Sequence, residues 1–311
     1  MEAVTQDEFA AMLAPMLAQP VRQVDILKYA ARLYSCMWLL RAHTPEGPVG
    51  VVAKAWYSAM DFDKQLKALQ AASAAYAGRA DVCIPYIGSQ RSKCILLMRQ
   101  VPDPTLAEMC RFSFRRRWTQ TLLQACARTG CWLAEWHAAS EKVEPVAPSL
   151  EAYLQDRGDC LRLLTADEQR RLTALIRSLG DDTTCVTHGD FMPGNVLWAP
   201  TRISVIDFGL PEWDRASPWW DYVAMEVGLT CALRFSSKSP GRWKPSMVQS
   251  AVEAFREGYG KRRGNGRTRL ACTAVRHLVL HAGDMRHGKA YRKRAEWHKL
   301  QLKKALLSAE K

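Results

Sequence analysis

The sequence predicts an α+β fold with two lobes: a small N-terminal β lobe of five strands and one helix, and a larger, mainly helical C-terminal lobe. Its 311 residues are more than a typical single domain holds. Apolar runs of strand type dominate residues 26–99, whereas helical spacing dominates from Pro102 onward. Because Pro102-Asp103-Pro104 interrupts any regular element, we expect residues 1–101 to form the first lobe and residues 102–311 the second.

The N-terminal lobe is predicted to contain three strands, a helix and two more strands, preceded by a short helix. That first helix is expected over residues 6–14, where Phe9, Met12 and Leu13 recur at helical spacing before Pro15. The second helix is expected over residues 61–76, which carry an apolar face. The five strands are expected over residues 26–30, 35–42, 49–56, 82–87 and 94–99.

The C-terminal lobe is predicted to be helical apart from one hairpin. The hairpin comprises two short apolar runs, residues 195–198 and 203–206, joined by a turn. The longest predicted helix repeats Leu122, Cys126 and Leu133 on one face. The helices are expected over residues 116–140, 149–161, 167–178, 218–229, 245–259, 270–281 and 289–307.

The positive charge of the chain is concentrated near its C-terminus. The formal net charge is +13, and residues 261–311 contain fifteen Lys and Arg against three acidic residues. This distribution indicates an anionic partner, or alternatively a solvated, charged terminal helix. Nucleic acid is disfavoured as that partner because no sequence-reading motif accompanies the charge.

Composition also predicts the cellular compartment. The ten cysteines are scattered singly and several fall in apolar runs, so we expect buried, reduced thiols. The first nine residues carry Glu2, Asp7 and Glu8 where a signal peptide would carry basic residues. No apolar run reaches the length of about 18 residues that a membrane span needs. A cytoplasmic protein is therefore expected.

Two short motifs carry the strongest chemical signal. The first is Thr187-His188-Gly189-Asp190-Phe191-Met192-Pro193-Gly194-Asn195, and the second is Ser204-Val205-Ile206-Asp207-Phe208-Gly209. A phosphoryl-transfer site needs a carboxylate at the acceptor hydroxyl, an amide oxygen five positions later on a metal, and a second carboxylate on that metal. Asp190, Asn195 and Asp207 fit these three roles. The alternative is that these residues only form turns, for which Asp, Asn and Gly are ordinary choices.

The two motifs resemble the catalytic and metal-binding loops of the aminoglycoside phosphotransferase and choline kinase group, small-molecule relatives of the protein kinases. His-Gly-Asp replaces the His-Arg-Asp of protein kinases, which favours a small-molecule or glycan acceptor. The similarity is sharp over residues 187–209 and diffuse over residues 26–229. It implies a protein-kinase-like fold, ATP and Mg²⁺ as cofactors, Asp190 as the catalytic base, and Asn195 and Asp207 as metal ligands.

The resemblance also implies a nucleotide site in the N-terminal lobe. Lys54 lies in an apolar run that matches the third strand of such lobes, where a lysine contacts the α- and β-phosphates; without this context it would be read as facing solvent. The family pairs this lysine with a Glu on the following helix. Here Asp63 stands near that position, and capping of the helix by Asp61 or Asp63 is the alternative.

Other nucleotide-binding positions are expected in two segments. The loop at residues 29–35 lacks glycine, so Arg32 would supply charge and Ser35 would permit close approach of the phosphates. Gln100 and Val101 match the hinge whose backbone pairs with adenine. After the second motif, Asp221 resembles a structural Asp that steadies the catalytic loop. His188 is expected to bond to backbone near Asp207, with a role as general base as the alternative. Trp213, Trp219, Trp220 and Trp243 are expected either to pack or to line an acceptor pocket.

The acceptor is expected to be anionic, such as a phosphorylated or acidic sugar or a glycolipid, because the C-terminal region is basic. The helix at residues 289–307 would bind that acceptor or an anionic membrane surface, which would make the protein peripheral at the inner membrane face. Trp297, Leu300, Leu302 and Leu306 would supply apolar contacts. Docking of this helix onto the C-terminal lobe is the alternative. Weak nucleotide-loop features also leave open a kinase-like protein that binds nucleotide or a partner without turnover.

Overall fold

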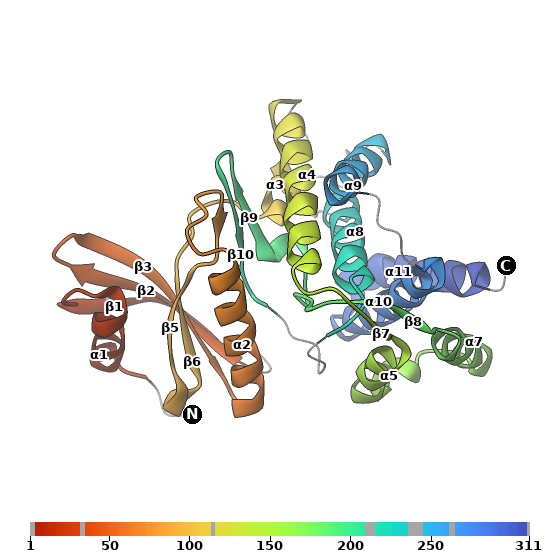
Figure 1. Cartoon of the computed structure of the whole chain (residues 1–311), viewed down its shortest axis with the longest axis horizontal. Helices are drawn as coiled ribbons and strands as arrows, with labels where there is room; N and C mark the ends of the chain where they lie inside the picture. Colours follow the sequence, from red (N-terminus) through yellow and green to blue (C-terminus); the bar gives the residue numbers. More distant parts are fainter. Residues whose placement is uncertain are drawn as a thin grey trace. The chain divides into compact units, whose positions relative to one another are not determined.

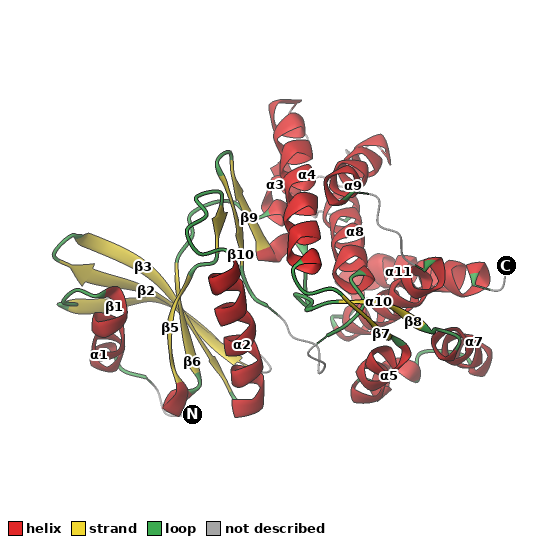
Figure 2. Cartoon of the chain, viewed as in Figure 1, coloured by secondary structure: helices red, strands yellow, loops and turns green. Residues whose placement is uncertain are grey.

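The protein folds into two compact units. The computed structural model describes residues 4–31, 35–112, 116–208, 215–235, 245–260 and 265–309. One unit comprises Met1–Pro104 and Leu197–Phe208, and the other comprises Thr105–Val196 and Gly209–Lys311. Strands dominate the first unit and helices dominate the second (Figures 1 and 2). The α+β fold that the sequence predicts is therefore confirmed.

The first unit is built on a five-stranded antiparallel sheet with the order β1-β2-β3-β6-β5. The strand β3 pairs with both β2 and β6 and is therefore interior to the sheet. Lys54 lies on β3, directly between Met37 and Leu96 in the register. The bounds are β1 (Gln23–Ala31), β2 (Ser35–Thr44), β3 (Gly47–Trp56), β5 (Tyr86–Gln90) and β6 (Ile95–Arg99).

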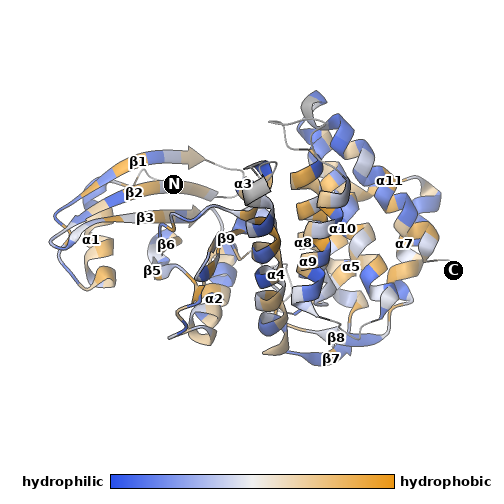
Figure 3. Ribbon diagram, turned by 90° about the horizontal axis from the view of Figure 1, so that it is seen from above, coloured by the Kyte–Doolittle hydropathy of each residue, from blue (hydrophilic) through white to orange (hydrophobic). Residues whose placement is uncertain are grey.

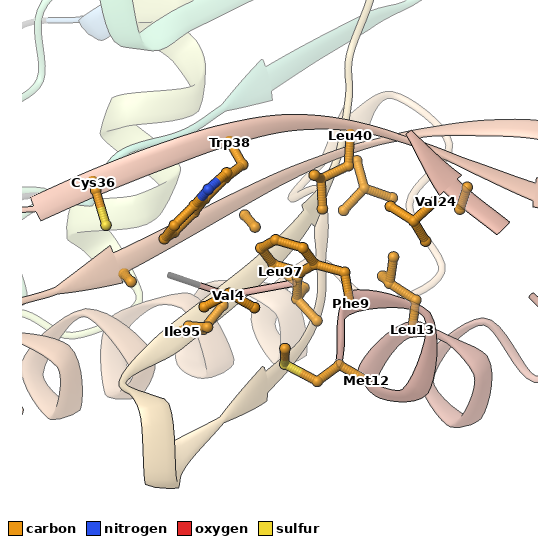
Figure 4. Close-up of a cluster of buried hydrophobic side chains, with 14 residues drawn as sticks. Val4, Phe9, Met12, Leu13, Val24, Cys36, Trp38, Leu40, Ile95 and Leu97 are labelled. Carbon is orange, nitrogen blue, oxygen red and sulfur yellow. The ribbon is translucent and has the colours of Figure 1, made fainter. Parts of the chain in front are cut away.

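The helix α1 (Gln6–Leu17) packs its apolar side against this sheet (Figure 4). Thr5 and Glu8 form a capping box that satisfies backbone N–H groups at its first turn. Phe9 is fully buried, and its ring centroid lies 5.4 Å from that of Trp38 on β2. Ala53 and Ala55 of β3 belong to the same cluster. Because side chains alternate along a strand, Lys54 projects from the opposite face.

One predicted strand, residues 82–87, is wrong because it is divided between two sheets. The strand β4 (Val82–Cys83) pairs in parallel with β10 (Arg202–Val205), and β9 (Val196–Ala199) completes this three-stranded sheet. The strand β5 begins only at Tyr86 and joins the five-stranded sheet. Pro85 lies between the two strands, where a residue that has no N–H to donate suits the break in pairing. The hairpin predicted from the second motif region is confirmed as β9 and β10.

The second helix of the first unit, α2 (Ala59–Ala75), is confirmed close to its predicted bounds. Ser58 caps it by accepting a hydrogen bond from the backbone N–H of Asp61 at 3.3 Å. Phe62, Leu66 and Leu69 are buried on its inner side. Its Phe62 ring lies 6.5 Å from the ring of Trp56 on β3.

The second unit is mainly helical, as predicted, and differs from the prediction in detail. The predicted helix at residues 149–161 is two helices, because Arg157 leaves helical geometry at φ −109° and ψ 36°. The predicted helix at residues 289–307 begins as a 3₁₀ turn, Lys289–Tyr291. The helix α3 and the two-stranded sheet of β7 and β8 are not predicted from the sequence. The bounds are α3 (Leu106–Phe112), α4 (Arg116–Ala138), β7 (Lys142–Pro145), α5 (Ala147–Asp156), α6 (Gly158–Leu161), α7 (Ala166–Arg177), β8 (Asp181–Thr184), α8 (Trp219–Arg234), α9 (Pro245–Tyr259), α10 (Gly266–Arg286) and α11 (Arg292–Ser308).

The helix α8 lies in the core of the second unit. Figure 3 shows apolar residues along its length, and ten of its sixteen residues are buried. A helix that is apolar on most sides is covered by several neighbouring elements rather than by a single one. None of the helices in the described ranges is both long enough and apolar enough to cross a membrane.

The helices α4 and α9 pack with their backbones in contact. A Cβ atom placed on Gly258 of α9 would lie 1.8 Å from the carbonyl oxygen of Ala127 on α4. A Cβ atom on Gly130 of α4 would lie 2.2 Å from the carbonyl oxygen of Phe255 on α9. Neither contact leaves room for a methyl group, so these two glycines set the separation of the helices.

We predict that Gly258→Ala lowers the free energy of unfolding by at least about 2 kcal/mol, because the added methyl group must push two backbones apart. Urea denaturation followed by circular dichroism measures this change. Gly283→Ala in α10 is the matched control, since a Cβ atom there meets nothing within 4 Å. It should raise stability by up to about 1 kcal/mol, as Ala favours a helix over Gly. Equal effects of the two substitutions would contradict the close-packing explanation.

Candidate active site

Lys54 and Asp207, both in the first unit, form an ion pair. The Nζ atom of Lys54 lies 2.5 Å from Oδ1 of Asp207 and 4.8 Å from the centroid of the Trp56 ring. The Lys54 side chain is 14% exposed and that of Asp207 is 32% exposed. An ammonium group largely removed from water requires an opposite charge nearby. The fold supplies one from a residue 153 positions further along the chain.

The β9–β10 hairpin carries Asp207 to this position. The backbone N–H of Ile203 on β10 donates to the carbonyl of Asp81 at 2.9 Å, and Arg202 Nε lies 2.9 Å from Asp103 Oδ2. These bonds attach the hairpin to the first unit. Just beyond β10, Asp207 adopts φ +56°, a left-handed conformation that Asp tolerates better than most residues. The backbone conformation of Asp207 therefore fixes the direction in which its carboxylate projects.

Asp63 does not pair with Lys54, contrary to the sequence prediction. Its Oδ1 atom lies 2.7 Å from Arg91 Nη1, and the two side chains are 54% and 70% exposed. Asp63 lies in the first turns of α2 on the solvent side, and a short Asp side chain cannot reach across from there to β3. The charge of Lys54 is neutralised by Asp207 instead.

Of the other predicted nucleotide-binding residues, those within the described ranges lie in or next to the sheet of the first unit. Arg32 lies outside the described residues. Ser35 begins β2 opposite Trp56 and is 6% exposed. The backbone N–H of Gln100 donates to the carbonyl of Gly50 at 2.8 Å, and Val101 is half-buried just after β6. Their roles in binding nucleotide stay predictions.

Asp190 and Asn195 lie together in one loop of the second unit. The side-chain Nδ2 of Asn195 lies 2.9 Å from the Asp190 carbonyl oxygen and 3.3 Å from Asp190 Oδ2. Both partners are acceptors, so the amide NH₂ group must face them. The amide oxygen of Asn195 consequently points away from Asp190, and it is the atom that a metal ion would require.

A buried carboxylate, that of Asp221 on α8, organises this loop. It accepts hydrogen bonds from the backbone N–H groups of His188 at 2.5 Å and Gly189 at 2.8 Å, and it is fully buried. Trp220 Nε1 donates to the Gly189 carbonyl at 2.9 Å. Gly189 adopts φ +84°, which glycine permits without strain. Asp221 therefore has the structural role that the sequence analysis expects.

His137 on α4 connects Asp221 to α9. Its Nε2 lies 3.2 Å from Asp221 Oδ2, and its Nδ1 lies 2.8 Å from the Tyr259 hydroxyl. Because a carboxylate accepts, Nε2 carries the proton and Nδ1 accepts from Tyr259. His188 Nδ1 accepts from the Asp190 N–H of its own loop at 3.3 Å, and a bond of His188 to backbone near Asp207 stays a prediction. The Asp221 carboxylate on α8 thus bonds directly to the loop and to α4, and it is linked to α9 through His137.

Arg276 on α10 is a contact of Asp190 that the sequence analysis missed. Its Nη2 lies 3.0 Å from Asp190 Oδ1, with 7% of the arginine side chain and 51% of the aspartate side chain exposed. The packed surroundings raise the pKa of Asp190, but the nearby guanidinium outweighs them, so the pKa lies below its ordinary value. The only sequence signal is a cation within the mainly apolar residues 270–280 of α10, and nothing in it identifies the partner 86 positions away.

Much of the C-terminal positive charge is paired within the second unit. Arg294 bonds to Asp284, Lys299 Nζ lies 2.8 Å from Glu168 Oε2, and Arg269 Nη2 lies 3.0 Å from Glu226 Oε2. Burial lowers the pKa of His277 and that of His298 to about 3, so both are neutral at pH 7. The charged side chains in these pairs are therefore already engaged within the second unit.

Two of the four apolar residues predicted to contact a membrane are in the core. Leu302 and Leu306 are at most 2% exposed, because α11 packs against α10, whereas Leu300 is 50% exposed. Trp220, predicted to pack or to line a pocket, is 1% exposed and packs. Trp213 and Trp243 lie outside the described residues.

Known proteins resemble this chain in sequence and fold. The model of the phosphotransferase enzyme family matches residues 53–271. No curated protein matches significantly. Macrolide 2'-phosphotransferase from Brachybacterium faecium is 17% identical, with a TM-score of 0.53 over 94% of this chain and 97% of that chain. Choline kinase from Streptococcus pneumoniae is 11% identical, with a TM-score of 0.56 over 98% of each chain. Glucosamine kinase in complex with glucosamine, ADP and inorganic phosphate is 13% identical, with a TM-score of 0.57 over 98% of this chain and 85% of that chain.

The structural likenesses establish the kinase-like fold that the motif resemblance implies. The family match begins one residue before Lys54 and extends through Asp190, Asn195 and Asp207, so both motifs fall inside it. It spans more than half of the 311 residues. The chain therefore belongs to the phosphotransferase enzyme family.

Proposed function

We propose that the protein transfers the γ-phosphoryl group of ATP to a hydroxyl group of a small molecule or glycan. The observation that carries this proposal is the ion pair between Lys54 and Asp207, at 2.5 Å. A lysine on a central strand and a carboxylate at the end of a hairpin are the pair that kinase-like sites use for the phosphates and the metal. The glucosamine kinase structure contains ADP, which supports an adenine nucleotide here.

The donor atoms suit Mg²⁺. Mg²⁺ prefers oxygen ligands and is usually bound by one or two side chains together with substrate phosphates. Lys54 engages Oδ1 of Asp207 and leaves Oδ2 for a metal, while the Asn195 amide oxygen faces away from Asp190. No group of three or more His, Cys, Asp or Glu residues in the described ranges could hold a metal by itself. A bound Mg²⁺ would neutralise charge on the nucleotide phosphates.

The remaining chemistry is assigned to the catalytic loop. Asp190 would accept the proton of the acceptor hydroxyl as that oxygen attacks the phosphoryl group. Asn195 fixes the orientation of the Asp190 carboxylate through the bond at 3.3 Å, and Asp221 fixes the backbone of the loop. Because the transition state of phosphoryl transfer is loose, positioning supplies more of the rate than proton abstraction. The buried scaffold beneath the loop suits that requirement.

We extend the proposal to an acceptor that carries a negative charge, such as an acidic or phosphorylated sugar or a glycolipid. The support is the net charge of +13, most of it in the last fifth of the chain. Ion pairs within the second unit neutralise part of that charge. The cation that lies on Asp190 itself is the more specific support.

We predict that Asp190→Asn lowers the rate of phosphoryl transfer by at least about a hundredfold, because the amide cannot accept the hydroxyl proton. Mg-ATP affinity should change little. ADP release with a panel of sugars and amino alcohols measures turnover, and calorimetry measures binding. Asp181→Asn, an exposed residue on β8 of the same unit, is the matched control. A turnover rate that survives in Asp190→Asn would remove this residue from the base role, whereas absence of turnover in the wild type would favour a protein that only binds nucleotide.

We predict that Asp207→Asn weakens Mg-ATP binding by at least about tenfold, or about 1.4 kcal/mol. The substitution removes a metal ligand and the charge that balances Lys54. Calorimetric titration with Mg-ATP, and with ATP in the presence of EDTA, separates the metal contribution. Asp63→Asn in the same titration tests the rejected pairing, since Asp63 contacts Arg91 instead of Lys54. Unchanged Mg-ATP affinity in Asp207→Asn would refute the metal assignment.

A further inference from the structure

The guanidinium of Arg276 is buried beside a carboxylate that is open to solvent. Its side chain is 7% exposed, whereas that of Asp190 is 51% exposed, and the two are joined at 3.0 Å. Trp220 lies beneath it, with its ring centroid 5.9 Å from the guanidinium carbon. The helix α10 therefore places a fixed positive charge at the edge of the exposed face of Asp190.

Arg276 has more hydrogen-bonding capacity than the fold uses. A guanidinium carries five N–H donors in a planar fork. Within the described ranges its hydrogen-bond partner is Asp190, and the buried Nε atom has none. Burial of a charge with donors to spare costs stability. A contribution to folding alone does not account for such a residue next to a catalytic carboxylate, whereas recognition of a ligand does.

A second cation, Arg157, lies near Arg276, and each of the two is paired with an aspartate. Tyr153 on α5 is packed against Trp220, with ring centroids 4.6 Å apart, and Arg157 lies 4.0 Å from the Tyr153 ring. Burial raises the pKa of Tyr153, while Arg276 and Arg157 act in the opposite direction. The guanidinium of Arg276 can donate hydrogen bonds to an acidic group of an acceptor, but it cannot do so to an ammonium group.

The geometry at Asp190 limits where that acid would lie. A hydroxyl that donates to Oδ2 of Asp190 would sit about 5 Å from Nη2 of Arg276, given ordinary hydrogen-bond lengths. A carboxylate or phosphate three to five bonds from the reacting hydroxyl oxygen would reach the guanidinium. We propose that Arg276 binds an acidic group of the acceptor and thereby selects anionic acceptors. This inference rests on the proposed phosphotransferase function.

Paired sugars that differ only in an acidic group test the inference. Glucose is compared with glucuronate and with glucose 6-phosphate, so that carboxylate and phosphate are separated. The full chain is assayed with Mg-ATP by ADP release, and binding of each sugar is measured by calorimetry in the presence of a non-hydrolysable Mg-nucleotide. We expect the wild type to favour at least one acidic sugar by at least about tenfold.

Arg276→Gln should abolish this preference by raising the KM of the acidic sugar, with the KM of ATP unchanged. Arg276→Lys keeps the charge without the fork, and it should retain part of the preference. Arg269→Gln is the matched control, because Arg269 lies two turns earlier on α10 and bonds to Glu226. The control should keep the full preference. A merely structural Arg276 would alter thermal stability without altering the ratio between acidic and neutral sugars.

The outcomes separate this inference from the proposed function. Turnover or binding with no preference for either acidic sugar, or a preference that persists in Arg276→Gln, overturns the inference and leaves phosphoryl transfer intact. Preferential binding of an acidic sugar without any turnover supports the inference and overturns the proposed function. Failure of the wild type to bind either acidic sugar also overturns the inference.

Discussion

The arrangement of the catalytic loop depends on one buried carboxylate, that of Asp221. A charge without solvent is stable only when donors surround it, and Asp221 receives two backbone N–H groups from the loop and the ring N–H of His137. Loss of this carboxylate would leave those buried donors unsatisfied. The close packing of α4 and α9 holds His137 against Tyr259. The geometry at Asp190 is therefore set by the packing of three helices.

Each unit neutralises its own functional charges. In the first unit Asp207 balances Lys54, and in the second unit Arg276 balances Asp190. The chain enters the first unit at Leu197, just after the first motif, and leaves it at Phe208, within the second motif. Both carboxylates are thus oriented by cations distant in sequence. Such preorganisation reduces the cost of ordering the site when a substrate binds.

Sequence patterns predicted the parts of the fold and site that depend on local information. Strand alternation and helical spacing located the sheet and the hairpin. The two motifs pointed to Asp190, Asn195 and Asp207, whose roles stay predictions. The patterns failed where distant segments decide the outcome. Residues 82–87 look like one strand, but each half finds a partner in a different sheet. Asp63 stood near the expected position in the sequence, yet its side of α2 faces solvent and Arg91. Arg276 gave no local signal of its contact with Asp190.

Net charge and local charge lead to different conclusions about the acceptor. A total of +13 describes how the protein attracts anions at a distance, and salt screens such attraction. Three of the cations that produce it, Arg269, Arg294 and Lys299, are paired with Glu226, Asp284 and Glu168. Arg276 differs because it is shielded from water and lies on Asp190, the proposed base. A desolvated guanidinium at that position would discriminate between acceptors more strongly than a solvated basic surface, since screening there is weakest.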